Sequence, residues 1–138
     1  MRTVPQALER VIAGSPADEV EHDQLDFKRQ SDSRNDTVSG LADAAVCFAN
    51  ATGGTVVLGV TDNIPGPDAL LGTDLDPAWV RRRIYEKTQP SLDVMAREFG
   101  YESVRLLEIV VQEGLDVYQV EGKARGCPEF RGTSVAVQ

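Results

Sequence analysis

The fold is decided by residues 48–60, which read Phe48-Ala49-Asn50-Ala51-Thr52-Gly53-Gly54-Thr55-Val56-Val57-Leu58-Gly59-Val60. Apolar residues at helical spacing lead into this stretch, so a helix is expected over residues 37–50, capped by Asn35 or Asp36. The Gly53-Gly54 pair is typical of a helix end followed by a turn. Residues 55–61 are almost wholly apolar, which predicts a buried, central strand.

Further helices and strands are expected on both sides of this unit. Thr3 suits the start of a helix over residues 3–13, and Asp76-Pro77 suits the start of a helix over residues 77–88. Strands are expected at residues 25–29, 92–99, 104–112 and 117–120. The expected fold class is therefore mixed α/β (α+β), with a central mixed sheet of about five strands flanked by helices.

Length and composition indicate an ordinary globular protein. The 138 residues suffice for one core, so residues 1–138 are expected to form a single domain, either alone or as the N-terminal domain of a longer protein. No apolar run is long enough to span a bilayer, and the first residues lack a signal peptide's apolar segment, so we expect a cytoplasmic protein without membrane contact. Cys47 and Cys127 are expected to be free thiols, although the sequence leaves a disulfide open.

The charge balance limits how this chain could hold a polyanion. Lys and Arg total 14 against 22 for Asp and Glu, a formal net charge of −8. Because Lys and Arg contacts supply much of the affinity for phosphate, this balance argues against tight non-specific DNA binding. A local basic patch is still predicted on the helix over residues 77–88, where four cations lie: Arg81, Arg82, Arg83 and Lys87. These side chains fan around the helix, so they cannot all face one ligand.

Three carboxylates and a lysine form the candidate catalytic set. Asp26 and Lys28 lie two apart on an expected strand and so share a face. Glu21 is five residues before Asp26, and the chain must bend for it to join them. Asp62 follows the buried strand. Carboxylate oxygens bind Mg²⁺ or Mn²⁺, and such a metal with a nearby lysine suits phosphodiester cleavage.

Each of these residues also has a plainer explanation. Asp26 and Lys28 could form an exposed ion pair of little energetic value. Glu21 lies in an acidic run of the kind that usually faces solvent, and Asp62 is a common turn residue. His22 could act as an acid or base beside Glu21, or be an ordinary loop histidine.

The order and spacing of three segments resemble the Schlafen AlbA-like family. These segments are residues 21–28, residues 48–60 and Asp62. Fainter support comes from Gln89-Pro90 and from residues 130–134. The resemblance runs from about Glu21 to Gly122. It departs from the family's common pattern at Asp26, where Glu is usual.

The resemblance implies a nucleic-acid-binding domain that acts on RNA or DNA. Some members are metal-dependent endoribonucleases, which here implies Glu21, Asp26 and Asp62 as metal ligands for Mg²⁺ or Mn²⁺, with Lys28 beside them and structured RNA as substrate. Nucleic-acid contacts are predicted at Arg131 and, from the basic cluster on the helix over residues 77–88, at Arg81, Arg82, Arg83 and Lys87. The alternative is a non-catalytic DNA-binding or protein-interaction module of a transcriptional regulator or ATPase-like protein, or a homodimer. Convergence of the three carboxylates would favour the enzyme.

Overall fold

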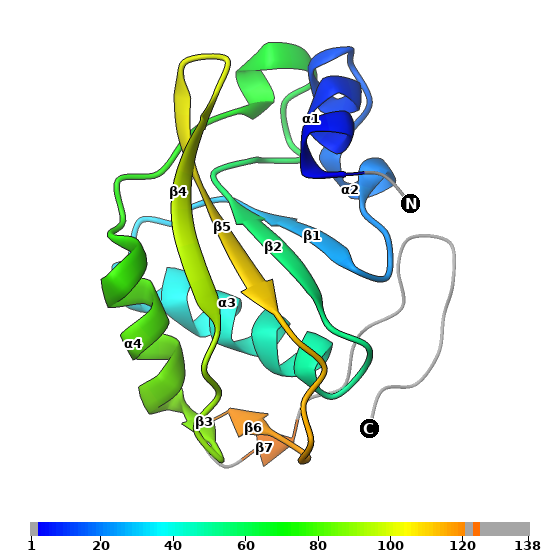
Figure 1. Ribbon diagram of the computed structural model, residues 1–138. Coiled ribbons are helices and arrows are strands. Elements are labelled where there is room, and N and C mark those ends of the chain that lie inside the picture. The colour runs from blue at the N-terminus through cyan, green and yellow to red at the C-terminus, as the bar shows by residue number, and fades with distance from the viewer. Residues whose placement is uncertain (1–2, 121–122, 125–138) are drawn as a thin grey trace.

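A mixed four-stranded sheet forms the centre of the fold in a computed structural model, which describes residues 3–120 and 123–124 (Figure 1). Its strand order is β1 (Leu25–Lys28), β2 (Gly54–Leu58), β5 (Val104–Val111) and β4 (Met95–Tyr101). The first two strands run parallel, and the other neighbouring pairs are antiparallel. A mixed sheet flanked by helices confirms the expected fold class.

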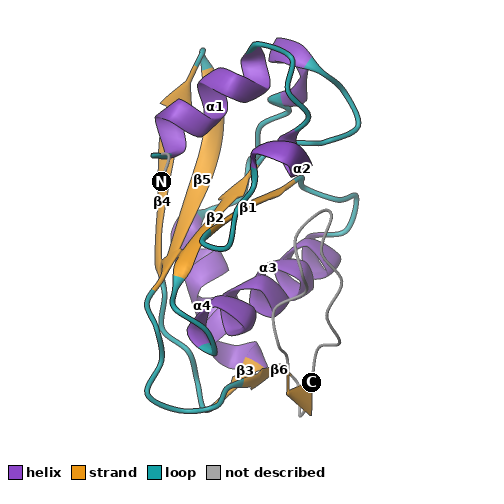
Figure 2. Ribbon diagram, turned by 90° about the vertical axis from the view of Figure 1, so that its right-hand side faces the viewer, coloured by secondary structure: helices purple, strands orange, loops and turns teal. Residues whose placement is uncertain are grey.

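Helices cover the two faces of this sheet unequally. The long helices α3 (Arg34–Ala49) and α4 (Pro77–Lys87) pack on one face (Figure 2). The other face meets α1 (Val4–Ile12), α2 (Ala17–Val20) and the 3-10 helix η1 (Gly66–Ala69) near one end of the sheet. Within the part of the chain that the structure describes, no helix is long and apolar enough to cross a membrane.

Successive side chains of β2 point to opposite faces of the sheet, so this strand contributes to the core on both faces. Val56 and Leu58 join the core under α3 and α4, whereas Val57 joins the core under α1 and α2. All three are fully buried. An almost wholly apolar run is what a strand covered on both faces requires, so the prediction of a buried central strand is confirmed.

A small second sheet lies beyond the central one. It contains β3 (Thr88–Gln89), β6 (Gln119–Val120) and β7 (Lys123–Ala124) in that order. The strand expected at residues 117–120 is β6, so it belongs to this small sheet.

Side-chain caps set where the helices begin. Thr3 caps α1, with Oγ1 accepting from the Gln6 N–H at 3.3 Å, and Asp76 caps α4, with Oδ2 accepting from the Trp79 N–H at 2.9 Å. The prediction for α3 was wrong by three residues. Ser33 is its cap, with Oγ accepting from the Asp36 N–H at 3.1 Å, so the helix begins at Arg34.

The two glycines after α3 have separate steric reasons. Gly53 has a φ of +83°, which lies in the left-handed region that favours glycine. A Cβ there would also lie 2.8 Å from the Val111 carbonyl oxygen. Gly54 has ordinary backbone angles, but a Cβ there would lie 2.6 Å from the Phe48 ring. Phe48 is 2% exposed. The expectation that Phe48 is core is therefore confirmed, and its ring explains the second glycine.

Asn50 ends α3 and holds a distant segment. Its Oδ1 accepts from the Tyr118 N–H at 2.8 Å, and its Nδ2 donates to the Tyr118 carbonyl oxygen at 3.1 Å. The amide thus satisfies both backbone groups of Tyr118, as a neighbouring strand would. This contact ties the end of α3 to the start of the small sheet.

Cys47, on α3, is buried at 8% exposure. It is disulfide-bonded, which corrects the expectation of a free thiol. Cys127 lies outside the described residues.

Candidate functional site

A tight turn brings Glu21 back against β1. The His22 N–H donates to the Leu25 carbonyl at 3.2 Å, and the Leu25 N–H donates to the His22 carbonyl at 3.0 Å. Beyond this turn, Glu21 Oε2 accepts from the Phe27 N–H at 2.7 Å. The bend that the sequence required between Glu21 and Asp26 is this turn, and it places the two carboxyl groups together.

Glu21 keeps its proton to an unusually high pH. Burial, reinforced by the hydrogen bond and charge of Asp26, raises the pKa of Glu21 to about 9. The Phe27 N–H and the Lys28 ammonium favour the ionised form but do not offset these causes. Lys28 Nζ lies 3.3 Å from Asp26 Oδ2. At neutral pH the cluster therefore consists of a protonated Glu21 beside an Asp26–Lys28 ion pair.

A pocket of about 350 Å³ opens beside this cluster. It is lined by Ala17, Asp18, Glu21, Phe27, Lys28, Arg29, Ser31, Val60, Thr61 and Asp62. These segments lie where the parallel strands β1 and β2 end, because Lys28 closes β1 and residues 60–62 follow β2. The carboxyl ends of parallel strands are frequent ligand sites. The structure thus brings Glu21, Lys28 and Asp62 to one pocket, whereas Asp26 contacts Glu21 but is not among the lining residues.

The predicted metal centre is not formed by these residues as they stand. Across residues 3–120 and 123–124, no three His, Cys, Asp or Glu side chains form a group that could hold a metal ion. Glu21 and Asp26 meet, but Asp62 shares their pocket without completing such a group. Among the described residues the three carboxylates therefore do not form a ready-made group for Mg²⁺ or Mn²⁺.

Sequence reasoning missed part of the pocket wall. The short helix α2 supplies Ala17 and Asp18, in a stretch that the sequence suggested was only an acidic run. A signal was present, since Pro16 followed by Asp18 and Glu19 is typical of a helical first turn. Arg29 and Ser31 were also missed, because nothing local shows that residues after β1 turn toward the loop after β2.

His22 lies in the turn and not among the residues that line the pocket. Its Nδ1 accepts from the Gln24 N–H at 3.2 Å and lies 3.7 Å from Asp23 Oδ1. Its Nε2 is buried and has no hydrogen-bond partner among the described residues. These contacts support a role in holding the turn.

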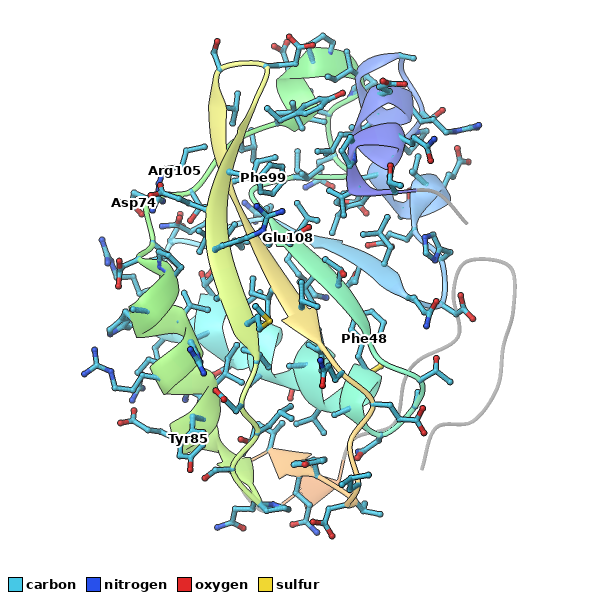
Figure 3. All side chains as sticks on the ribbon, in the orientation of Figure 1. Phe48, Asp74, Tyr85, Phe99, Arg105 and Glu108 are labelled. Carbon is cyan, nitrogen blue, oxygen red and sulfur yellow. The ribbon has the colours of Figure 1, made fainter. Side chains whose placement is uncertain are left out.

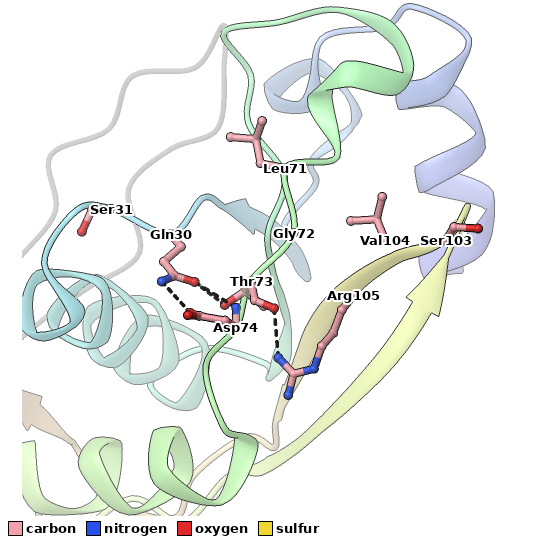
Figure 4. Close-up of a pocket in the computed structure, with 9 residues that line it drawn as sticks. All are labelled: Gln30, Ser31, Leu71, Gly72, Thr73, Asp74, Ser103, Val104 and Arg105. Carbon is pink, nitrogen blue, oxygen red and sulfur yellow. Dashed lines mark hydrogen bonds between the residues drawn. The ribbon is translucent and has the colours of Figure 1, made fainter.

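A larger pocket of about 580 Å³ lies next to the first and shares Ser31 with it (Figure 4). Gln30 Oε1 accepts from Thr73 Oγ1 at 2.6 Å, and Gln30 Nε2 donates to Asp74 Oδ1 at 2.9 Å. Arg105 Nη1 donates to the carbonyl oxygens of Thr73 and Leu75, both at 2.9 Å. Because these polar groups satisfy one another, we interpret this network as a brace for residues 73–75 and not as a ligand site.

Two cations of the predicted basic patch, Arg81 and Arg83, are paired with carboxylates of this chain. Arg81 forms a two-point ion pair with Asp93 at 2.7 and 2.8 Å, which lowers the pKa of Asp93. Arg83 pairs with Glu86 at 3.0 Å. Arg82 is exposed and Lys87 is half-buried. Arg131, the remaining predicted contact, lies outside the described residues.

Comparison with known proteins identifies the family of this chain. Residues 21–129 match the family described as Schlafen, AlbA_2. The chain belongs to this family. The AlbA_2 match covers all the segments that carried the sequence resemblance except the closing one, residues 130–134.

Two solved structures resemble this AlbA_2 domain, each with a TM-score of 0.60. One is the DIP2311 protein from Corynebacterium diphtheriae, at 23% identity over 85% of this chain; the match spans only 23% of that longer chain. The other is the N-terminal domain of a putative ATP-dependent DNA helicase RecG-related protein from Nitrosomonas europaea, at 22% identity over 99% of this chain and 93% of that one. At these identities the likeness shows the fold. No curated protein matches the chain.

Proposed function

We propose that this AlbA_2 domain binds nucleic acid. The observation that carries the proposal is the pocket at the ends of β1 and β2. Two cationic residues, Lys28 and Arg29, are among the residues that line it. The proton held by Glu21 and the pairing of Asp26 with Lys28 reduce the negative charge of this cluster below what its residue types suggest. A phosphate can therefore approach this part of an acidic domain. The name of the Nitrosomonas relative, a DNA helicase-related protein, also supports a nucleic-acid context.

The proposal is tested by fluorescence anisotropy with labelled RNA and DNA oligonucleotides in EDTA. Affinity should fall as salt rises, because phosphate contacts release counterions. Lys28→Ala should weaken binding. Arg97→Ala is the matched control, since it removes the same charge from β4, at the other edge of the sheet. Salt-independent binding, or equal losses in the two variants, would contradict the proposal.

Metal-dependent cleavage of structured RNA is the finer form of this proposal. The contact between Glu21 and Asp26, with Lys28 beside them and Asp62 on the same pocket, supports it. The absence of a group of three metal ligands among the described residues weighs against it. Asp26 is also one methylene shorter than the usual Glu, and catalysis demands tighter geometry than binding does.

A cleavage assay separates these possibilities. Labelled tRNA incubated with Mn²⁺ should be cut weakly, and EDTA should stop the cutting. Asp26→Asn and Lys28→Ala should each abolish cleavage without lowering the melting temperature by more than a few degrees. If the wild type never cuts and Asp26→Glu does not restore cutting, the endoribonuclease hypothesis fails for this chain.

A non-catalytic interaction module is the second candidate function. It is favoured by the net charge of −8 and by the DIP2311 match, in which the similar region is 23% of a longer chain. Such a module would act as part of a larger regulator or ATPase-like protein, or as a homodimer. Absence of binding to every RNA and DNA probe would make this candidate the one to pursue.

A further inference from the structure

Tyr85 on α4 is a large aromatic side chain that the structure leaves half-exposed, at 49% (Figure 3). We infer that the outer face of α4 binds a single-stranded nucleic acid, with one base stacked on Tyr85 and a neighbouring phosphate held by Arg82. This inference rests on the proposed function and names the strandedness of the ligand and the contact that selects it.

The helix places Tyr85 between two arginines. Arg81 is four residues before it and Arg82 three residues before it, and both spacings put side chains on adjoining parts of one helical face. Stacking of a base on an aromatic ring, with arginine on the backbone, is how many proteins hold single strands. The face therefore offers the two kinds of contact that a nucleotide needs.

Ion pairs within the molecule decide which arginine is available. Arg81 is fixed by its two contacts with Asp93, and Arg83 contacts both Glu86 and, at 3.4 Å, Asn35 Oδ1. Arg82 is exposed, and the described residues provide no ion-pair partner for it. A phosphate beside Tyr85 would thus meet Arg82 without displacing an existing carboxylate.

The chemistry of this face favours a single strand over a duplex. A base can lie on the Tyr85 ring only when it is unpaired and unstacked, whereas the base faces within a duplex are covered by neighbouring base pairs. Phosphate contacts alone give weak binding in a domain with a net charge of −8. Stacking does not depend on charge, so it suits an acidic domain.

The test is anisotropy with three probes in EDTA: a labelled uridine oligonucleotide, a thymidine oligonucleotide of equal length, and a duplex. Tyr85→Ala should weaken binding of the single strands by about 5- to 150-fold. Tyr85→Phe, which keeps the ring, should bind like the wild type. Arg82→Gln should reduce the slope of log affinity against log salt by about one. Melting temperatures should be unchanged, because both side chains are exposed.

The outcomes separate this inference from the proposed function. If the wild type binds none of the probes, the proposed function itself fails. If the wild type binds and Tyr85→Ala binds equally well, only the α4 inference is overturned. Equal losses for the duplex and the single strands would also overturn it, because losing a stacking contact should not weaken the binding of a duplex. A loss confined to the uridine or to the thymidine strand would support it and show which of the two strands stacks on Tyr85.

Discussion

Replacing Phe48 with alanine should lower the free energy of unfolding by about 3–5 kcal/mol, the range for removing a fully buried phenyl ring. Phe48 is 2% exposed and heads the fully buried side chains of the core by size. Urea unfolding followed by circular dichroism measures the change. Phe48→Leu is the control, because it keeps most of the apolar volume and should cost much less. A loss below about 1 kcal/mol for Phe48→Ala would contradict the packing described.

The close approach of Gly54 to the Phe48 ring gives a second test of this packing. A methyl group at Gly54 would collide with the Phe48 ring at 2.6 Å. Gly54→Ala should therefore be destabilising in the wild type and less so in the Phe48→Ala background. A double-mutant cycle should give a coupling energy of about 0.5–3 kcal/mol. Additive effects would show that the ring does not require glycine there.

Replacing Glu21 with glutamine should stabilise the domain above neutral pH, by about 1–3 kcal/mol at pH 8. The pKa of Glu21 is raised from 4.5 to about 9 in the folded protein. Between these values the native state keeps a proton that the unfolded chain has lost, so the contribution of Glu21 to stability is fully present below pH 4.5 and falls as pH rises toward 9. Glutamine keeps an acceptor for the Phe27 N–H and carries no charge.

Urea titrations in EDTA at pH 5, 7 and 8 measure this difference. The advantage of Glu21→Gln should shrink toward zero near pH 5. Glu98→Gln is the matched control, since Glu98 is exposed and paired with Arg105, and its effect should not follow this pH profile. A destabilising Glu21→Gln at pH 8, or an effect that is constant with pH, would contradict the assignment of a proton to Glu21.

Local patterns predicted most of the fold because its elements depend on near neighbours. The helix, glycine turn and strand of residues 48–60 follow from spacing, from the φ of Gly53 and from an apolar run. The start of α3 was less predictable, since Ser33, Asn35 and Asp36 are all good caps. The helix α2 was missed because four residues are too few to show a period.

The candidate site was predictable only in its residue types. That Glu21 could meet Asp26 was conditional on a bend, and the bend depends on backbone bonds between His22 and Leu25. The raised pKa of Glu21 depends first on burial, which no spacing reveals. Asp93 lies twelve residues after Arg81, in a loop, so their ion pair required the tertiary fold. By contrast, the pairing of Arg83 with Glu86 follows from their spacing of three residues on one helix.

The contact between Asn50 and Tyr118 has a consequence for how this sequence can drift. The amide oxygen and nitrogen bond to the backbone N–H and carbonyl of residue 118, so these two bonds do not depend on which side chain stands there. Position 118 can therefore be substituted without loss of these two bonds. Gly114 in the same loop is constrained for a different reason, since a Cβ there would collide with the Tyr118 ring. The constraint falls on position 50, where only an amide of this length offers a donor and an acceptor together.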